Sequence, residues 1–205
     1  MIDVHKDGDL WYVTLNRPEK ANSLTPDMLA TLIEVVGDAH GVAKCLILSG
    51  VGNVFSAGAD LDAAKAGLAT SPLWEELSTS MAALPCLTIA ALNGTLAGGA
   101  FGMALACDLR IAVPEAKFFY PVMTLGYLPQ PSDPKRLVAL IGPARAKMIL
   151  MAGQKIGADE AVSWGLIDRV VARDDLMSAA LDLGRTVLAA PVSHVAGIKG
   201  LVRCE

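Results

Sequence analysis

Two segments of small residues have the composition of loops that bind a ligand through the main chain. They are Phe55–Leu61 (FSAGADL) and Asn93–Phe101 (NGTLAGGAF), and each joins an apolar run to the start of a predicted helix. Small side chains let a ligand approach the backbone closely, and a helix N-terminus offers unpaired N–H groups at the positive end of its dipole. One N–H group from each loop could therefore hold a developing oxyanion. The alternative is that the glycines and alanines only permit tight strand-to-helix turns.

Motifs for other kinds of chemistry are missing from the sequence. The second loop lacks the Lys-Ser/Thr pair of a phosphate-binding P-loop, neither loop spells G-x-G-x-x-G, and no G-x-S-x-G marks a hydrolase nucleophile. The three histidines, His5, His40 and His194, have no metal-ligand spacing. We therefore expect no metal site.

The elements that must position the two loops follow an α/β pattern. Continuous apolar runs predict buried strands at Leu10–Asn16, Lys44–Ser49, Cys86–Leu92, Cys107–Val113 and Lys117–Tyr120. Capping signals and helical periodicity predict helices at Met28–Ala39 after a Thr25-Pro26 start, at Asp60–Met81 with a break near Ser71-Pro72, and at Gly98–Ala106, Lys135–Leu140, Ala144–Met151, Ala158–Trp164 and Leu176–Ala189. No repeat or linker interrupts this alternation, so we expect one layered α/β domain.

Composition narrows the partners and the compartment. A net charge of −4 argues against a nucleic-acid partner. Although 53% of the residues are hydrophobic, no apolar run approaches the roughly 20 residues of a membrane helix. We therefore expect no membrane span. We interpret the apolar excess as buried subunit contacts, and the alternative is a large apolar core. The N-terminus lacks a signal-peptide pattern and the cysteines lack C-x-x-C spacing, which predicts a cytoplasmic protein with reduced thiols at Cys45, Cys86, Cys107 and Cys204.

Four blocks of the sequence, in order, resemble signatures of the crotonase superfamily, the enoyl-CoA hydratase/isomerase family. They are Asn16–Leu24 (NRPEKANSL), Phe55–Leu61, Asn93–Phe101 together with Ala106–Ala112 (ACDLRIA), and Ala158–Val171 (ADEAVSWGLIDRVV). The resemblance covers residues 8 to about 172, which is far more specific than two small-residue loops alone.

The resemblance implies a fold and an assembly. The fold is a ClpP-like spiral of ββα turns, here a single domain over 1–205 with its core at about 8–172 and a shortened helical C-terminal part at 173–205. Family members are usually trimers or dimers of trimers, so a homotrimer or hexamer is expected. Members normally continue with helices that cover the acyl pocket, which predicts an open pocket or a cover from another subunit.

The resemblance also implies an acyl-CoA thioester as substrate, with coenzyme A as part of that substrate and no separate cofactor. The thioester oxygen would lie between the backbone N–H groups of Ala59 and Gly99 and be stabilised there as an enolate. The residues expected to contact the CoA moiety are Lys20, Asn22, Ala57, Asp60 and Leu61. For Lys20 and Asn22 the alternative is a solvated loop, and for Asp60 it is a helix cap.

Two departures from the family pattern bear on the reaction. Enoyl-CoA hydratases hold water with two glutamates, and those positions are Gly102 and Val122 here. Neither can move a proton, which argues against standard hydration. It also predicts that Gly102→Glu with Val122→Glu gains some hydration of crotonyl-CoA.

The candidate replacements for these carboxylates are Tyr120, Tyr127, Gln130 and Asp133. Asp133 is the candidate base, with a helix N-cap before Pro134 as its alternative role. The functional hypotheses are a lyase or isomerase that uses enolate chemistry, or a non-catalytic pseudo-enzyme that binds CoA thioesters or stabilises a partner.

Overall fold

A six-stranded sheet runs through the middle of the computed structural model, which describes residues 1–202. Its order is β1-β2-β3-β5-β7-β10, with an antiparallel β1–β2 hairpin and parallel pairing between the other neighbours. A second sheet has the order β4-β6-β8-β9, with β8 and β9 antiparallel. The strands are β1 Ile2–Asp7, β2 Leu10–Leu15, β3 Cys45–Gly50, β4 Val54–Ser56, β5 Leu87–Leu92, β6 Thr95–Ala97, β7 Leu109–Ala112, β8 Lys117–Phe119, β9 Ile156–Gly157 and β10 Arg169–Val170.

The chain winds between the two sheets as a spiral. Strand β3 of the large sheet is followed by β4 of the small sheet and then by helices, and β5–β6–α4 and β7–β8–α5 repeat this order. Each turn therefore adds one strand to each sheet and then a helical segment. The predicted α/β spiral of ββα turns is confirmed.

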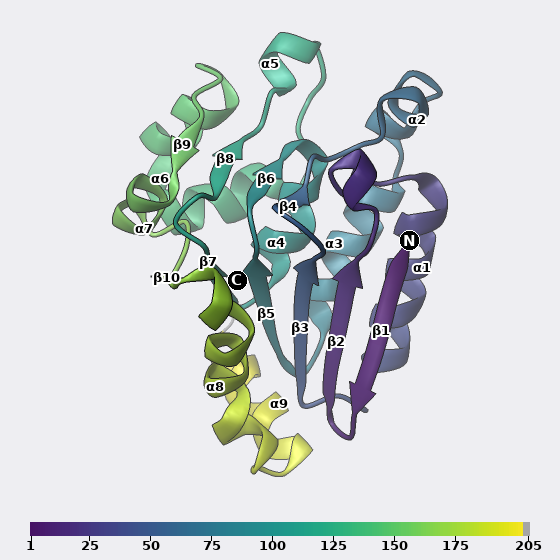
Figure 1. Cartoon of the computed structure of the whole chain (residues 1–205), viewed down its shortest axis with the longest axis vertical. Helices are drawn as coiled ribbons and strands as arrows, with labels where there is room; N and C mark the ends of the chain where they lie inside the picture. The colour runs from purple at the N-terminus through teal and green to yellow at the C-terminus, as the bar shows by residue number, and fades with distance from the viewer. Residues whose placement is uncertain (203–205) are drawn as a thin grey trace.

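Helices connect the strand pairs and cover the large sheet (Figure 1). Helix α8 contacts β3, β5 and β7, whereas α1 packs against α3 and α3 against α4. The helices are α1 Pro26–Ala39, α2 Leu61–Lys65, α3 Leu73–Ala83, α4 Phe101–Ala106, α5 Val122–Leu125, α6 Asp133–Leu150, α7 Ala158–Trp164, α8 Leu176–Leu188 and α9 Val192–Leu201, with 3-10 helices η1 Pro18–Lys20, η2 Leu68–Thr70, η3 Gly98–Ala100 and η4 Arg173–Asp175. Within residues 1–202, no helix has the length and apolarity needed to cross a membrane.

The strongest local signals in the sequence predicted their elements well. The Thr25 hydroxyl accepts a hydrogen bond from the Met28 amide at 3.3 Å and caps α1, which has Pro26 in its first turn. Strands β3 and β5 are buried along almost their whole length, which explains their continuous apolar runs. The predicted break between helices near residue 142 is a non-helical Gly142 inside α6.

Elements without a strong local signal were not predicted. Strand β1 is mostly exposed and charged, because it lies at the edge of the sheet, and so it lacks an apolar run. Strands β4, β6, β9 and β10 have two or three residues each, and their pairing partners come from elsewhere in the chain. In the predicted helical part at 173–205, η4, α8 and α9 are observed, and residues 203–205, including Cys204, lie outside the described residues.

Candidate active site

The two small-residue loops lie against each other because they leave neighbouring parallel strands. The first loop begins in β4 and the second contains β6, and β4 pairs with β6. Gly58 has φ +89, and a Cβ atom placed on it would lie 2.9 Å from the Ala97 carbonyl oxygen and 3.4 Å from the Gly99 nitrogen. The loops therefore meet main chain to main chain, and a side chain at Gly58 would force them apart.

The amide of Ala59 faces away from the segment that pairs with its loop. In the bridge between Leu24 and Ala59, the Leu24 amide donates to the Gly58 oxygen at 2.7 Å and the Asp60 amide donates to the Leu24 oxygen at 2.8 Å. This pattern uses the groups on either side of Ala59. In the part of the chain that the structure describes, no acceptor engages the Ala59 N–H.

The amide of Gly99 is also unpaired. Gly99 is the second residue of η3, a position at which an N–H group has no acceptor within its own helix. No acceptor elsewhere in residues 1–202 replaces it. Ala59 and Gly99 line one cavity, so both unpaired amides belong to residues at the same site.

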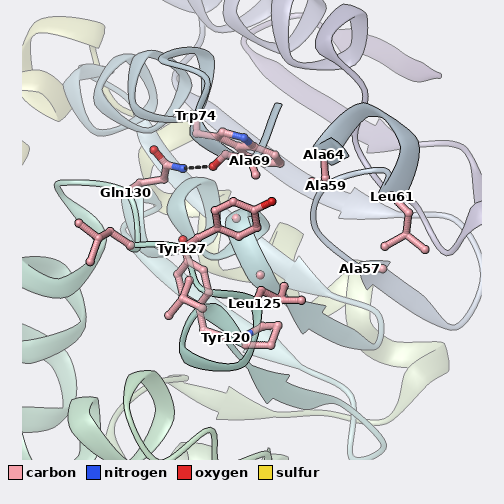
Figure 2. Close-up of a pocket in the computed structure, with 15 residues that line it drawn as sticks. Ala57, Ala59, Leu61, Ala64, Ala69, Trp74, Tyr120, Leu125, Tyr127 and Gln130 are labelled. Atoms are coloured by element: carbon pink, nitrogen blue, oxygen red, sulfur yellow. Dashed lines mark hydrogen bonds between the residues drawn. The ribbon is translucent and has the colours of Figure 1, made fainter. Parts of the chain in front are cut away.

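That cavity has a volume of about 220 Å³ and a mostly apolar wall. Figure 2 shows Ala57, Ala59 and Leu61 on one side, with Tyr127 and Gln130 across from them. A Cβ atom on Gly99 would lie 3.2 Å from the Trp74 ring, so this ring packs directly against the second loop. The residues that line the cavity are Ala57, Ala59, Leu61, Ala64, Ala69, Trp74, Gly98, Gly99, Tyr120, Pro121, Val122, Leu125, Tyr127, Leu128 and Gln130.

The residues expected to contact CoA divide into those that line the cavity and those that do not. Ala57 and Leu61 line the cavity, and the Leu61 side chain is exposed. Lys20 is exposed at the end of η1 and does not line the cavity. Asp60 caps α2 by accepting from the Asp62 and Ala63 amides, and its other oxygen pairs with Arg17 at 2.8 Å. The Arg17 hydrogen bond is the main cause that holds the Asp60 pKa below its ordinary value.

Asn22 is fully buried, and its side-chain amide makes hydrogen bonds within the fold. Its Oδ1 accepts from the Arg17 amide at 2.8 Å, and its Nδ2 donates to the carbonyl oxygens of Val51 and Val54 at 2.9 and 2.7 Å. A direct contact between this side chain and CoA would require these bonds to break. The structure therefore places Asn22 behind the first loop rather than on the cavity wall.

Asp133 lies behind the cavity wall and does not cap its helix. It is the first residue of α6 and only 1% exposed, and its Oδ2 accepts from the Tyr120 hydroxyl at 2.9 Å. The predicted alternative, an N-cap role, is wrong, because Ser132 holds the N-cap position and the Asp133 carboxylate accepts from Tyr120 and not from a helix amide. Burial raises the Asp133 pKa from 3.8 to about 7, and Glu75 adds to the rise, while the Tyr120 hydrogen bond and Arg136 oppose it.

Gly102 and Val122 differ in their access to the cavity. Val122 lines it, whereas Gly102 is buried in α4. Trp74, Leu125 and Leu128 also line the cavity and were not predicted as site residues. No motif marks them, because α3, α5 and the segment after α5 that contains Leu128 reach the cavity only through the packing of the spiral.

Two parallel-strand loops with unpaired amides over an apolar cavity define a class of site that can bind an oxyanion through the main chain.

The family model described as enoyl-CoA hydratase/isomerase matches residues 5–204. YngF of Bacillus subtilis is 36% identical over 90% of this chain and 74% of its own length. The short-chain-enoyl-CoA hydratase of Clostridium acetobutylicum is 34% identical over 94% of this chain and 77% of its own.

A solved structure agrees with these sequence relatives. A Thermobifida fusca protein solved in complex with CoA superposes with a TM-score of 0.88 at 27% identity, over 98% of this chain and 83% of that one. The chain belongs to the enoyl-CoA hydratase/isomerase family and has the crotonase fold.

Proposed function

We propose that this protein binds an acyl-CoA thioester and polarises the thioester carbonyl between the N–H groups of Ala59 and Gly99. The observation that carries the proposal is the presence of two unpaired amides, from separate loops, on residues of one cavity. The CoA complex of the Thermobifida fusca structure supports the choice of ligand. The apolar wall suits an acyl group, and the small residues suit close approach to the main chain.

The chemistry of this arrangement is the stabilisation of an enolate. Two N–H groups beside an apolar wall stabilise the negative charge that develops on the thioester oxygen, and each such donor contributes about 2.7–4 kcal/mol. Because Gly102 and Val122 carry no titratable group, standard hydration is not the proposed reaction. The proposed class is isomerisation or a lyase reaction through the enolate, with Asp133 as the candidate proton acceptor.

The CoA moiety is proposed to run from the cavity past Ala57 and Leu61 toward Lys20, whose ammonium group would face the phosphates. Lys20→Ala should then weaken CoA binding. The loss should be larger at low salt, because at high salt the ions already screen the attraction between an exposed lysine and the phosphates. Lys147→Ala is the matched control, since Lys147 is also an exposed lysine, lies in the last turn of α6 and does not line the cavity. A homotrimer or hexamer remains part of the proposal, and light scattering on the purified protein tests it.

The test of the oxyanion role removes one donor. Gly99→Pro deletes the Gly99 N–H, whereas Gly99→Ala keeps it and adds only the Cβ contact with Trp74. Turnover of a panel of crotonyl-, 3-butenoyl- and malonyl-CoA is measured for each, with binding followed by calorimetry. We expect Gly99→Pro to lose at least about 100-fold more turnover than Gly99→Ala. Equal turnover of the two variants would remove the Gly99 amide from the mechanism.

A second candidate function is a non-catalytic protein that binds a CoA thioester or stabilises a partner. The observation that favours it is the absence of a titratable side chain at both Gly102 and Val122. The same panel separates the two functions. Binding of CoA esters without turnover of any of them selects the pseudo-enzyme.

A further inference from the structure

The carboxyl group of Asp133 lies beside Gly102, although the two residues belong to different helices. A Cβ atom placed on Gly102 would lie 3.0 Å from Oδ1 of Asp133 and 3.6 Å from its Oδ2. The Ser78 hydroxyl oxygen would be 3.5 Å from the same Cβ. A carboxylate that starts from α6 therefore occupies the space into which a side chain on α4 would project.

One oxygen of this carboxylate has no hydrogen bond. Among residues 1–202, Oδ1 of Asp133 is the only buried side-chain oxygen or nitrogen that has no hydrogen-bond partner. An unpaired buried carboxylate oxygen costs folding free energy, so its presence calls for an explanation other than stability. The charged groups that face Asp133 are Arg136 on its own helix and Glu75 on α3, and Arg136 also donates to Ser78 and Ser132.

Tyr120 connects this buried carboxylate to the cavity. Its side chain lines the cavity with Ala59 and Gly99, and its hydroxyl contacts Oδ2 of Asp133 at 2.9 Å. The ring is held in place by stacking on Phe101, with 5.4 Å between centroids. Tyr120 is thus in contact with the cavity on one side and with a buried proton acceptor on the other.

We propose that Tyr120 and Asp133 form a proton relay that moves a proton between the α-carbon of the bound thioester and Asp133, an inference that rests on the proposed function. The Tyr120 oxygen takes the α-hydrogen while its own hydroxyl proton passes to Oδ2 of Asp133. The C–H bond and the original O–H bond break, a tyrosine O–H and a carboxylic O–H form, and the C–H electron pair becomes the enolate held by the two amides. Protonation of the enolate carbon is the reverse of this step.

The relay predicts which protonation state is active. Removal of the α-hydrogen requires Asp133 as the carboxylate, so the exchange rate should rise with pH and level off above about 7, where Asp133 is ionised. Tyr120 stays protonated over this range because burial and the neighbouring Asp133 raise its pKa. Tyr120 would touch the substrate, whereas Asp133 acts through Tyr120.

The experiment follows deuterium exchange at the α-carbon of 3-butenoyl-CoA in D₂O by mass spectrometry, with binding of the same thioester measured by calorimetry. Tyr120→Phe and Asp133→Asn should each lower exchange by about 100-fold or more with binding kept within a few fold. The pH rise near 7 should vanish in Asp133→Asn. The matched controls are Tyr12→Phe, a tyrosine on β2, and Asp27→Asn, an exposed aspartate in the first turn of α1, and both should exchange like the unchanged protein.

The outcomes separate this inference from the function on which it rests. No binding of 3-butenoyl-CoA by the unchanged protein overturns the proposed function and the relay together. If the unchanged protein binds 3-butenoyl-CoA without exchange, or if Tyr120→Phe exchanges at the full rate, the relay is overturned and thioester binding is left in place. A pH profile in Asp133→Asn that still rises near 7 removes Asp133 from the relay.

Discussion

Asn22 and Asn93 donate hydrogen bonds to the same acceptor, the carbonyl oxygen of Val54, at 2.7 and 3.2 Å. Asn22 also donates to Val51, and Asn93 donates to Gly52 and accepts from the Gly50 amide. Two side chains from different parts of the sequence therefore clamp the segment that leads into β4. Because β4 carries the first loop, this clamp sets where the Ala59 amide lies.

Replacing the Asn22 amide by a carboxylate should break the clamp with almost no change in shape. In Asn22→Asp, an oxygen would face the carbonyl oxygens of Val51 and Val54 in place of a donor. We expect a loss of about 2–4 kcal/mol in the free energy of unfolding, measured in urea at neutral pH. Asn16→Asp is the control, because the Asn16 side chain bonds only at the exposed surface. Similar losses in both variants would contradict the clamp.

A methyl group at Gly58 should separate the two loops. Gly58→Ala combines positive φ with a Cβ only 2.9 Å from the Ala97 oxygen, whereas Gly8→Ala has φ +56 and open space around the Cβ. Backbone strain should cost both variants about 1–2 kcal/mol. Gly58→Ala should lose more stability than that, and its affinity for CoA thioesters should fall, measured by calorimetry. If Gly58→Ala binds as tightly as Gly8→Ala, close contact of the loops is not needed.

The sequence predicted the parts of the site that local motifs encode. The two loops, their glycines and the alternation of strands and helices depend on neighbouring residues. The resemblance to the family, which rests on those loops, named Ala59 and Gly99, and both residues line one cavity. Thr25 and Pro26 likewise mark a helix start by themselves. These features need no knowledge of distant contacts.

Other parts of the site depend on how distant elements pack. The contact between Gly102 and Asp133 joins α4 to α6, and no local pattern in either segment predicts it. Trp74 reaches the second loop only because α3 packs on α4. Asn22 was matched to the family by motif, but its buried hydrogen bonds became visible only in three dimensions.

Stability should depend on pH through Asp133. Its pKa is raised from 3.8 to about 7 by burial, so the folded protein binds this proton more tightly than the unfolded chain does. This contribution is fully present below pH 4 and is lost as pH rises toward 7, by up to about 4 kcal/mol. Unfolding in urea from pH 4 to 8 should show this slope in the unchanged protein and in Asp27→Asn. In Asp133→Asn the slope should be flatter, and an unchanged slope would contradict the assignment.

The position of Asp133 alters what a transplanted pair of glutamates can do. The resemblance alone predicts that Gly102→Glu with Val122→Glu gains hydration, but a side chain at position 102 starts 3.0 Å from the Asp133 carboxylate. Crowding and like charge should therefore destabilise the double variant and keep it inactive. Adding Asp133→Ala removes both problems and leaves the Ala59 and Gly99 amides in place.

We accordingly expect the triple variant, and not the double, to hydrate crotonyl-CoA. Loss of the conjugated enoyl-thioester absorbance measures the reaction, and thermal unfolding checks the fold of each variant. Val122→Glu with Asp133→Ala is the control, since it lacks the carboxylate at position 102. A folded triple variant that binds crotonyl-CoA without hydrating it would show that positions 102 and 122 do not face the substrate as the hydratase glutamates do. Hydration by the triple variant alone would show that Asp133 occupies the place of a catalytic side chain on α4.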